Sequence, residues 1–425
     1  MPSSASAHQP TVAAPGFIHQ GSAEFRRVNW ALFAAGLATF SLLYCVQPLL
    51  PEFSRDYGVS EAVSALSLSL STFVLGIGML FAGALSDAWG RKPVMVLSTT
   101  VSAVLVLASA VMPNWTSLLV VRTLLGLTLS GLPAVAMTYL AEEMDAASIG
   151  LGMGLYISGN AIGGMSGRLI TGVLADFVNW RVGVAVVAVL GLICAIVFWR
   201  LLPPSKHFTP QPLSRRALLG RFGVIFHDRG LPWLFAEGFL LLGGFVTIYN
   251  YIGYRLLAPP YNLSQAVVGA IFIIYLIGTF SSPWVGSLAG RHGRRKVLWT
   301  MLALVLIGTL LTALASLWWI LLGVVVLTFG FFGGHSTASS WVGRRAGPAR
   351  AHGSSLYLFC YYMGSSIAGA HGGVFYAQHG WNGVVWFVGA MEALGLVIAL
   401  GLYRLKPLPQ NTPTPPTPMS RGAMP

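Results

Sequence analysis

The feature that most constrains this chain is the recurrence of long apolar stretches along nearly its whole length. These stretches are 28–50, 63–85, 93–112, 117–140, 148–173, 180–202, 231–254, 264–289, 297–315, 317–341, 353–377 and 384–403. Each approaches the roughly 20 residues that a helix needs to cross a bilayer. Only 9% of the residues are charged, whereas soluble domains carry about 25%. Because hydrocarbon cannot satisfy open backbone groups, the sequence predicts an all-α polytopic membrane protein.

An internal repeat organises these stretches. Landmarks recur at offsets of 203–205 residues: Trp30 and Trp233, Gly83 and Gly286, Ser60 and Ser264, Gly159 and Gly364. An even number of helices in each repeat makes the halves parallel, related by an axis along the membrane normal, with a cavity expected between them. The repeat therefore predicts twelve transmembrane helices in two six-helix, pseudo-symmetric bundles.

The same pattern divides the chain into regions. The N-terminal bundle is expected at 28–202 and the C-terminal bundle at 231–405, joined by a basic cytoplasmic linker at 203–230. The polar segment 1–27 and the Pro-rich segment 406–425 are expected to be disordered tails, because they lack the apolar residues that a packed core requires.

The net charge of +13 raises the question of a nucleic-acid partner. With the N-terminus inside, twenty Lys and Arg residues fall on predicted inner segments and three on outer loops. This asymmetry is typical of membrane topology, so we expect cytoplasmic termini and no nucleic acid. The three cysteines lie within predicted spans and indicate neither a disulfide framework nor a metal site.

A glycine-rich, charged loop lies between the second and third predicted spans and recurs in the second half. The first copy contains Gly83, Asp87, Gly90, Arg91 and Lys92, and the second contains Gly286, Gly293, Arg294 and Arg295. Glycines permit tight turns and close approach, and a carboxylate can pair with cations or stabilise a helix N-terminus. The alternative is a turn whose charges reflect only its position on the inner side of the membrane. The presence of two matching copies favours gate loops instead. Gly290 replaces the acid in the second copy, so we expect a weaker salt link there.

These motifs resemble signatures of the major facilitator superfamily. The first loop is similar to Gly-x-x-x-Asp-(Arg/Lys)-x-Gly-(Arg/Lys)-(Arg/Lys), with Ala88 in place of the usual base. Arg122, Gly126 and Gly131 resemble the signature of the fourth helix. In the fifth helix, Gly150, Gly159, Gly163 and Gly167 resemble the antiporter motif, with Gly164 replacing its proline and Arg168 its last glycine. The segments LYCVQPLLPEFSRDYGVS and GNAIGGMSGRLITG are similar to the YnfM-like, arabinose-efflux-permease-like branch of bacterial exporters.

This resemblance implies proton-driven export by alternating access in the bacterial inner (plasma) membrane. Small residues at helical spacing let backbones approach, so we expect the fifth helix to pack against the other half; packing within its own half is the alternative. The absence of the motif proline removes an expected kink and weakens the antiport inference.

Ionisable residues inside the spans are candidates for proton coupling, because they are costly to bury. We expect Glu237 to bind the coupling proton and His335 to share it, although a structural, hydrogen-bonded carboxyl is the alternative. Arg122 is expected to modulate proton release or bind an anionic solute, unless it snorkels. Arg168 is expected at the outer interface near Asp176, in a structural role.

Neutral polar residues and tyrosines are candidates for binding the solute. Gln47 and Asn250 are symmetry mates 203 residues apart near predicted outer ends, where paired amides would suit a polar solute or an outer gate. Asn160, Tyr44, Tyr156 and Tyr249 are further candidates, although most membrane aromatics face lipid or the interface. Glu392, on the last predicted span, receives no role beyond a possible helix or dimer contact.

The leading functional hypothesis is a proton-coupled exporter of small organic solutes such as drugs or metabolites, acting as a monomer in the bilayer. Sugar efflux, an uptake carrier and a facilitator use the same fold and stay open, as does a receptor without transport. An enzyme is not expected, because the sequence contains no nucleophile elbow, metal-spaced cluster or phosphate loop. No cofactor is expected other than the coupling proton.

Overall fold

The computed structural model describes residues 16–145, 148–210 and 227–404, and these fold almost entirely into helices. Within those ranges, the only strand-like pairing is an isolated bridge between Ile18 and Met144. The linker residues 211–226 and the predicted tails at 1–15 and 406–425 lie outside the described residues.

The N-terminal half is a bundle of helices that covers the first six predicted spans. Its elements are α1 (Ala23–Tyr44), η1 (Gln47–Leu49), α2 (Leu50–Tyr57), α3 (Glu61–Ser64), α4 (Leu66–Trp89), α5 (Arg91–Ser109), α6 (Trp115–Leu129), α7 (Pro133–Glu143), α8 (Ile149–Phe177) and α9 (Trp180–Leu201). Helix α1 begins before the predicted span because Ser22 accepts a hydrogen bond from Phe25 N at 3.0 Å, which caps the helix. Residues 23–27, expected in a disordered tail, are therefore helical.

The C-terminal half repeats the pattern. Its elements are α12 (Leu231–Leu257), α13 (Gln265–Ala270), η2 (Ile271–Tyr275), α14 (Leu276–His292), α15 (Arg294–Leu311), α16 (Leu317–Arg345), η3 (Gly347–Ala349) and α17 (Arg350–Tyr403). Helix α17 contains the last two predicted spans, because the chain reverses at Gly380, which has φ 57° and ψ −147°. Such a conformation is available to glycine, so one residue replaces the expected loop.

Every predicted span coincides with helix, and nine helical stretches of the described chain are long and apolar enough to cross a membrane. The helix of the predicted span 117–140 is interrupted near its middle. Helices α6 and α7 are separated at residues 130–132, because Pro133 cannot donate a backbone hydrogen bond to the preceding turn.

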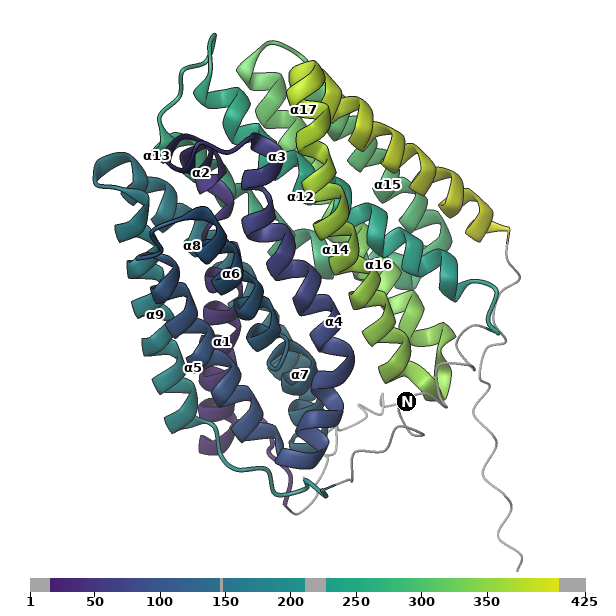
Figure 1. Ribbon diagram of the computed structural model, residues 1–425. Helices are drawn as coiled ribbons and strands as arrows, with labels where there is room; N and C mark the ends of the chain where they lie inside the picture. The colour runs from purple at the N-terminus through teal and green to yellow at the C-terminus, as the bar shows by residue number, and fades with distance from the viewer. Residues whose placement is uncertain (1–15, 146–147, 211–226, 405–425) are drawn as a thin grey trace, which may run out of the picture.

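The two halves lie side by side and converge at one end, where α2, α3 and α13 lie in Figure 1. The hydrogen bonds between the halves cluster toward this end, which is the predicted outer side. Tyr254 Oη bonds to Ser54 and Ser64 at 2.7 and 2.6 Å, and the Thr72 and Ser366 hydroxyls lie 2.8 Å apart. Among the described residues, no hydrogen bond joins the halves at their predicted inner ends.

The glycines at 159, 163 and 167 of α8 pack against α1 of the same half, while the helix also packs against α13, η2 and α14, so the expected contact with the other half is present but is not made by these glycines. A Cβ atom added at Gly159 or Gly163 would lie 2.4 or 2.2 Å from the carbonyl oxygen of Phe33 or Leu37. The four-residue spacing matches on the two helices, which lets their backbones approach. Gly172 alone of this series reaches the other half, where its added Cβ would lie 2.7 Å from Gly269 Cα.

Candidate functional site

The two symmetry-related amides meet where the halves join. Gln47 Nε2 donates to Asn250 Oδ1 at 2.8 Å, and both side chains are buried. Gln47 follows the end of α1, whereas Asn250 lies within α12. The amides therefore bind each other directly, in a contact that links the N-terminal and C-terminal halves.

Arg168 extends this contact into α8. Its Nε donates to Gln47 Oε1 at 2.7 Å, and its Nη2 donates to Tyr275 Oη at 3.4 Å. The result is a continuous polar chain from Arg168 through Gln47 to Asn250. It crosses from the N-terminal half to the C-terminal half.

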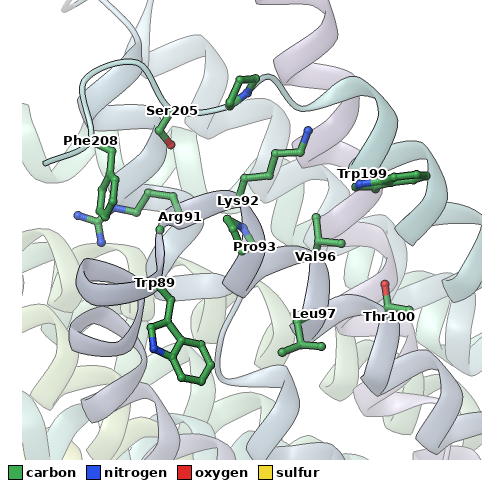
Figure 2. A pocket seen from close by; sticks show the side chains of 12 residues that line it. Trp89, Arg91, Lys92, Pro93, Val96, Leu97, Thr100, Trp199, Ser205 and Phe208 are labelled. Carbon is green, nitrogen blue, oxygen red and sulfur yellow. The ribbon is translucent and has the colours of Figure 1, made fainter. Parts of the chain in front are cut away.

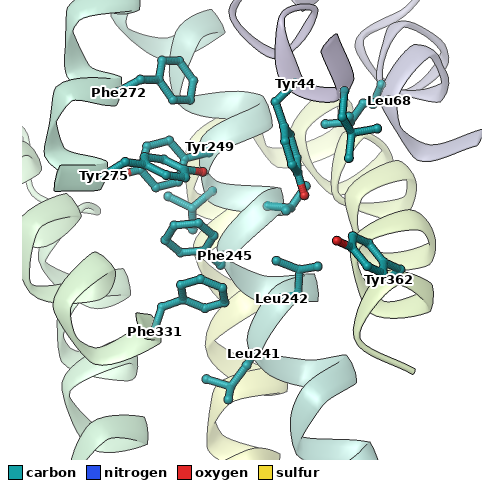
Figure 3. Close-up of a cluster of buried hydrophobic side chains, with 14 of the residues drawn as sticks. Tyr44, Leu68, Leu241, Leu242, Phe245, Tyr249, Phe272, Tyr275, Phe331 and Tyr362 are labelled. Atoms are coloured by element: carbon teal, nitrogen blue, oxygen red, sulfur yellow. The ribbon is translucent and has the colours of Figure 1, made fainter. Parts of the chain in front are cut away.

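Aromatic rings surround the Arg168 guanidinium. Its Cζ lies 4.2 Å from the ring centre of Tyr44, 4.4 Å from that of Tyr275 and 5.1 Å from that of Phe272. Cations at these distances are attracted by the π-faces of the rings. Figure 3 shows these three rings together with Tyr362, whose hydroxyl points toward that of Tyr44.

The expected place of Arg168 near Asp176 at the outer interface is wrong. Arg168 is buried between the halves, whereas Asp176 accepts a hydrogen bond from Ala266 N at 3.3 Å. Counting helical rise gives the depth of a residue but not the face on which it lies. That face was decided by the packing of α8 against α1 and η2.

The two departures of α8 from the antiporter motif have one structural explanation. The guanidinium of Arg168 folds back onto its own helix, where Nη1 donates to Gly164 O at 2.5 Å. A Cβ added at Gly164 would lie only 3.1 Å from this Nη1. Glycine at 164 therefore leaves room for the guanidinium of Arg168 to fold back onto the helix.

Arg122 is fully buried and is held by three main-chain carbonyl groups. Its Nε donates to Ser67 O at 2.9 Å, and its Nη1 and Nη2 donate to Leu42 O and Leu43 O at 3.2 and 2.6 Å. The last two carbonyls belong to the final turn of α1, where a helix leaves acceptors open and favours a cation. Arg122 thus fastens α1 to α4 and α6, and it does not snorkel to a surface.

Glu237 and Glu392 form the most unusual buried pair of the C-terminal half. A Cβ added at Gly395 would lie 3.2 Å from Glu237 Oε2, and one added at Gly244 would lie 2.2 Å from Glu392 Oε1. Each carboxyl thus lies opposite a glycine of the other helix, in the contact between α12 and α17. None of their four oxygens has a hydrogen-bond partner among the described residues, and the two charges lie within electrostatic range.

Glu237 does not face the contact between the halves. Its carboxyl faces the interior of its own half, where α12 packs against α17. Glu392 makes the helix contact that the sequence left open, since it packs against α12.

His335 is connected to the neighbourhood of Glu237 through Tyr357. His335 Nδ1 and Tyr357 Oη lie 3.0 Å apart, and the Tyr357 ring contacts the position of Gly238, next to Glu237. Tyr357 lies on α17 and within electrostatic range of Glu237. It was missed because one tyrosine within a predicted apolar span carries no distinguishing signal.

The remaining solute-binding candidates separate into two groups. Asn160 lies against α1, where its Oδ1 is 2.4 Å from the position of a Cβ at Gly36, and Tyr156 is buried beside it on α8. Tyr249 belongs to the C-terminal half, where its hydroxyl bonds to Thr328 at 2.8 Å and its ring contacts Tyr275. Of the tyrosine candidates, Tyr44 is the one that stacks on Arg168.

Comparison with known proteins decides the family of this fold. The model of the major facilitator superfamily matches residues 32–261 and 238–423. The inner membrane transport protein YnfM of Escherichia coli (strain K12) is 51% identical over 388 residues, covering 91% of this chain and 93% of that protein. The uncharacterized MFS-type transporter YybF of Bacillus subtilis (strain 168) is 47% identical over 399 residues, covering 93% and 98%. The chain belongs to the major facilitator superfamily.

The fold agrees with that assignment. The crystal structure of the nucleoside transporter NupG superimposes with a TM-score of 0.71 at 18% identity, covering 89% of this chain and all of that one. The protein is thus a multi-pass membrane transporter and not an enzyme.

The first gate loop of this superfamily member is tied within its own half. Arg91 donates from Nε and Nη2 to Glu142 at 3.0 and 2.7 Å, and from Nη1 to Ser86 and Asp87. Lys92 donates to the carbonyl of Leu202 at the end of α9. The loop therefore joins α4, α5, α7 and α9 without reaching the C-terminal half in any hydrogen bond of the described residues.

The second gate loop lacks such ion pairs. Arg294 Nε donates to Ser340 Oγ at 3.1 Å, and Arg295 Nη1 donates to Tyr403 O at 3.3 Å. No ion pair of the described residues involves either arginine. In this half the inner surface is held instead by Arg345 and Asp228, whose Nε and Oδ1 lie 2.7 Å apart.

A pocket of about 700 Å³ lies beside the first gate loop, at the ends of α4 and α9 and the start of α5. Figure 2 shows Trp89, Lys92, Trp199 and Phe208 among its lining side chains. Both tryptophans are largely exposed, as is typical of side chains at a membrane interface. The pocket is lined by the N-terminal half and the start of the linker, and it is separate from the contact between the halves.

Proposed function

We propose that this transporter exports small organic solutes in exchange for protons by alternating access. The observation that carries the proton coupling is Glu237, a fully buried carboxyl whose two oxygens have no hydrogen-bond partner among the described residues. An isolated carboxylate is far costlier to bury than a neutral carboxylic acid. This environment therefore favours a proton on Glu237 and its release when the packing around α12 changes.

The arrangement of the halves supports alternating access. They are joined toward the predicted outer ends by side-chain contacts such as Gln47 with Asn250, while Arg91 of the first gate loop bonds within its own half. Breaking the outer set and forming an inner set would move the opening from one side to the other. With the predicted topology, the present arrangement faces the cytoplasm.

The side chains at the contact favour an amphipathic solute. Tyr44, Tyr275 and Tyr362 present rings with polar tips, which suit aromatic or partly apolar molecules. Sugar efflux is less favoured, because the Gln47 and Asn250 amides that would bind hydroxyl groups already bond to each other.

The test uses inverted membrane vesicles that contain the full chain. Candidate solutes are screened for their ability to dissipate a pH gradient, which is followed with a pH-sensitive dye. We expect Glu237→Gln to abolish solute-dependent proton movement while solute-for-solute exchange continues, because the amide keeps the shape but cannot carry the proton.

The matched control is Glu24→Gln, since that carboxyl pairs with Lys206 near the linker and should leave coupling unchanged. Undiminished proton movement in Glu237→Gln would overturn the role of Glu237. Solute flux that never responds to a pH gradient would overturn proton coupling altogether.

A further inference from the structure

Arg168 is a buried cation with no carboxylate beside it. All twelve Asp and Glu residues of the chain lie within the described ranges, and none forms an ion pair with Arg168. Two other arginines do form ion pairs: Arg91 binds Glu142 at 2.7 Å, and Arg345 binds Asp228 at 2.7 Å. A buried positive charge normally has such a partner.

The guanidinium also keeps unused donors. It has five N–H groups, and hydrogen bonds to described residues occupy one on each of its three nitrogens. The bond to Tyr275 Oη is long at 3.4 Å. One N–H on Nη1 and one on Nη2 therefore have no partner among the described residues and stay available for an acceptor such as a carboxylate.

A second observation points the same way. At the far end of the Arg168–Gln47–Asn250 chain, Asn250 Nδ2 is buried and has no hydrogen-bond partner among the described residues, and the same holds for Ser69 Oγ. Both atoms face the position that a Cβ of Gly369 would occupy, at 3.2 and 3.4 Å. The contact between the halves therefore has unsatisfied donors at both ends of one network.

The surroundings of Arg168 restrict the body of such a ligand. Rings of Tyr44, Tyr275 and Phe272 lie around the guanidinium, and Tyr249 extends the aromatic wall by contact with Phe272 and Tyr275. These rings favour a flat, apolar ligand body by offset or edge stacking.

Binding at this position would also act on the contact between the halves. The hydrogen bond from Arg168 Nη2 to Tyr275 joins α8 to η2 and is long at 3.4 Å. A carboxylate held by the other N–H of the same Nη2 would draw the guanidinium toward the ligand and weaken this contact between the halves.

We propose that the transported solutes are aromatic carboxylates and that Arg168 binds the carboxylate. This inference rests on the proposed function only in that the chain carries small organic solutes. It does not depend on proton coupling or on Glu237.

The experiment measures ligand binding by the full-length protein in lipid nanodiscs at pH 7.5, using isothermal titration calorimetry. The probes are benzoate, 4-hydroxybenzoate and 2-naphthoate, with 2-naphthalenemethanol as the uncharged match. We expect at least one carboxylate to bind more tightly than the alcohol. Arg168→Gln should weaken that binding by about 10- to 100-fold, as expected for a lost charge-assisted hydrogen bond, and leave binding of the alcohol nearly unchanged.

Arg168→Lys keeps the charge without the fork of donors and should retain part of the affinity. The charge control is Arg26→Gln, an exposed arginine at the start of α1, which should leave all affinities unchanged. Binding of the alcohol reports that each variant is folded.

Failure of every carboxylate to bind better than the alcohol would overturn the proposal, as would an unchanged preference in Arg168→Gln. Glu237→Gln should still bind the carboxylate. Loss of proton coupling with intact carboxylate binding would therefore count against the proposed function and not against this inference.

Discussion

Within their predicted spans, the two halves of this transporter bury ionisable side chains of opposite type, basic in one half and acidic in the other, and they treat them differently. In the N-terminal half, Arg122 and Arg168 each make three hydrogen bonds. In the C-terminal half, the carboxyl oxygens of Glu237 and Glu392 have no partner among the described residues. A guanidinium cannot lose its charge, so the protein must solvate it, whereas a carboxyl becomes neutral by binding a proton. Within the predicted spans, the arginines thus lie where the fold supplies acceptors, and the two carboxyls lie where the described residues supply no donor.

Arg122→Gln tests the fixed-charge side of this comparison and should have the largest effect. The shorter amide cannot reach all three carbonyl groups, so buried acceptors lose their donor, and we expect a loss of about 3 kcal/mol or more. The measurement is the free energy of unfolding in detergent micelles, followed by circular dichroism. Arg26→Gln serves as the surface control, and an equal effect of both variants would show that burial of Arg122 contributes nothing.

Gly163→Ala tests whether the packing of α8 on α1 is what positions the charges of the N-terminal half. An added Cβ would lie 2.2 Å from Leu37 O, so the helices must separate, at a cost of about 1–3 kcal/mol. Gly150→Ala is the matched control, because no atom lies within 4 Å of its added Cβ. We expect the control to retain wild-type thermal stability; a similar loss in both variants would contradict the packing of α8 on α1.

Asp228→Asn tests a carboxylate of the C-terminal half that does have partners. Burial alone would raise the pKa of Asp228, but hydrogen bonds from Arg345 and from the N–H groups of Gly230 and Leu231 hold the pKa below its ordinary value. A lowered folded-state pKa stabilises the protein above the unfolded pKa, and this contribution disappears as the pH falls through the folded one. We therefore expect the variant to lose about 1 kcal/mol at pH 7, because the neutral amide cannot form the ion pair with Arg345.

The difference between wild type and Asp228→Asn should shrink as the pH falls below about 3.9. Thermal unfolding between pH 7 and pH 2 measures it. A difference that stays constant over this range would show that the ionised carboxylate is not what stabilises the start of α12.

Glu392→Gln should have the smallest effect on stability and is the sharpest test of the comparison. If the carboxyl is buried without partners, an amide of the same shape should change the free energy of unfolding by less than about 1 kcal/mol. Thermal unfolding at pH 7 measures this, with Glu392→Lys as the destabilising contrast. A large loss in Glu392→Gln would indicate that this carboxyl has a charged partner after all.

Several features of this fold followed from patterns that the sequence itself contains. The apolar stretches predicted where helices occur, since a bilayer admits few other structures. The repeat of 203 residues identified Gln47 and Asn250 as mates, and the structure places their side chains 2.8 Å apart. Pseudo-symmetry brings equivalent positions together at the axis, so this contact was accessible without coordinates.

Other features depended on which face of each helix packs against which neighbour. The spacing of Gly159, Gly163 and Gly167 predicted close packing but not its partner, because α1 and a helix of the other half offer the same four-residue ridges. Arg168 was expected at the outer interface and is instead buried between the halves, because the sequence does not show which face of α8 is covered by a neighbouring helix. The sequence placed Glu237 within a span but did not show which face of α12 it occupies, and packing turns its carboxyl toward Gly395 on α17.

The sequence by itself determined that this chain is an all-helical, duplicated membrane transporter, because hydrophobic length and internal repetition are one-dimensional properties. Only the tertiary structure decided which buried charges have partners. The hydrogen bonds from Arg122 to α1 and from Arg168 to Gln47 join residues 79 to 121 positions apart. The bond from Arg122 to Ser67 joins residues 55 positions apart. Such bonds are fixed by helix rotation and packing, and neither is written in the order of the residues.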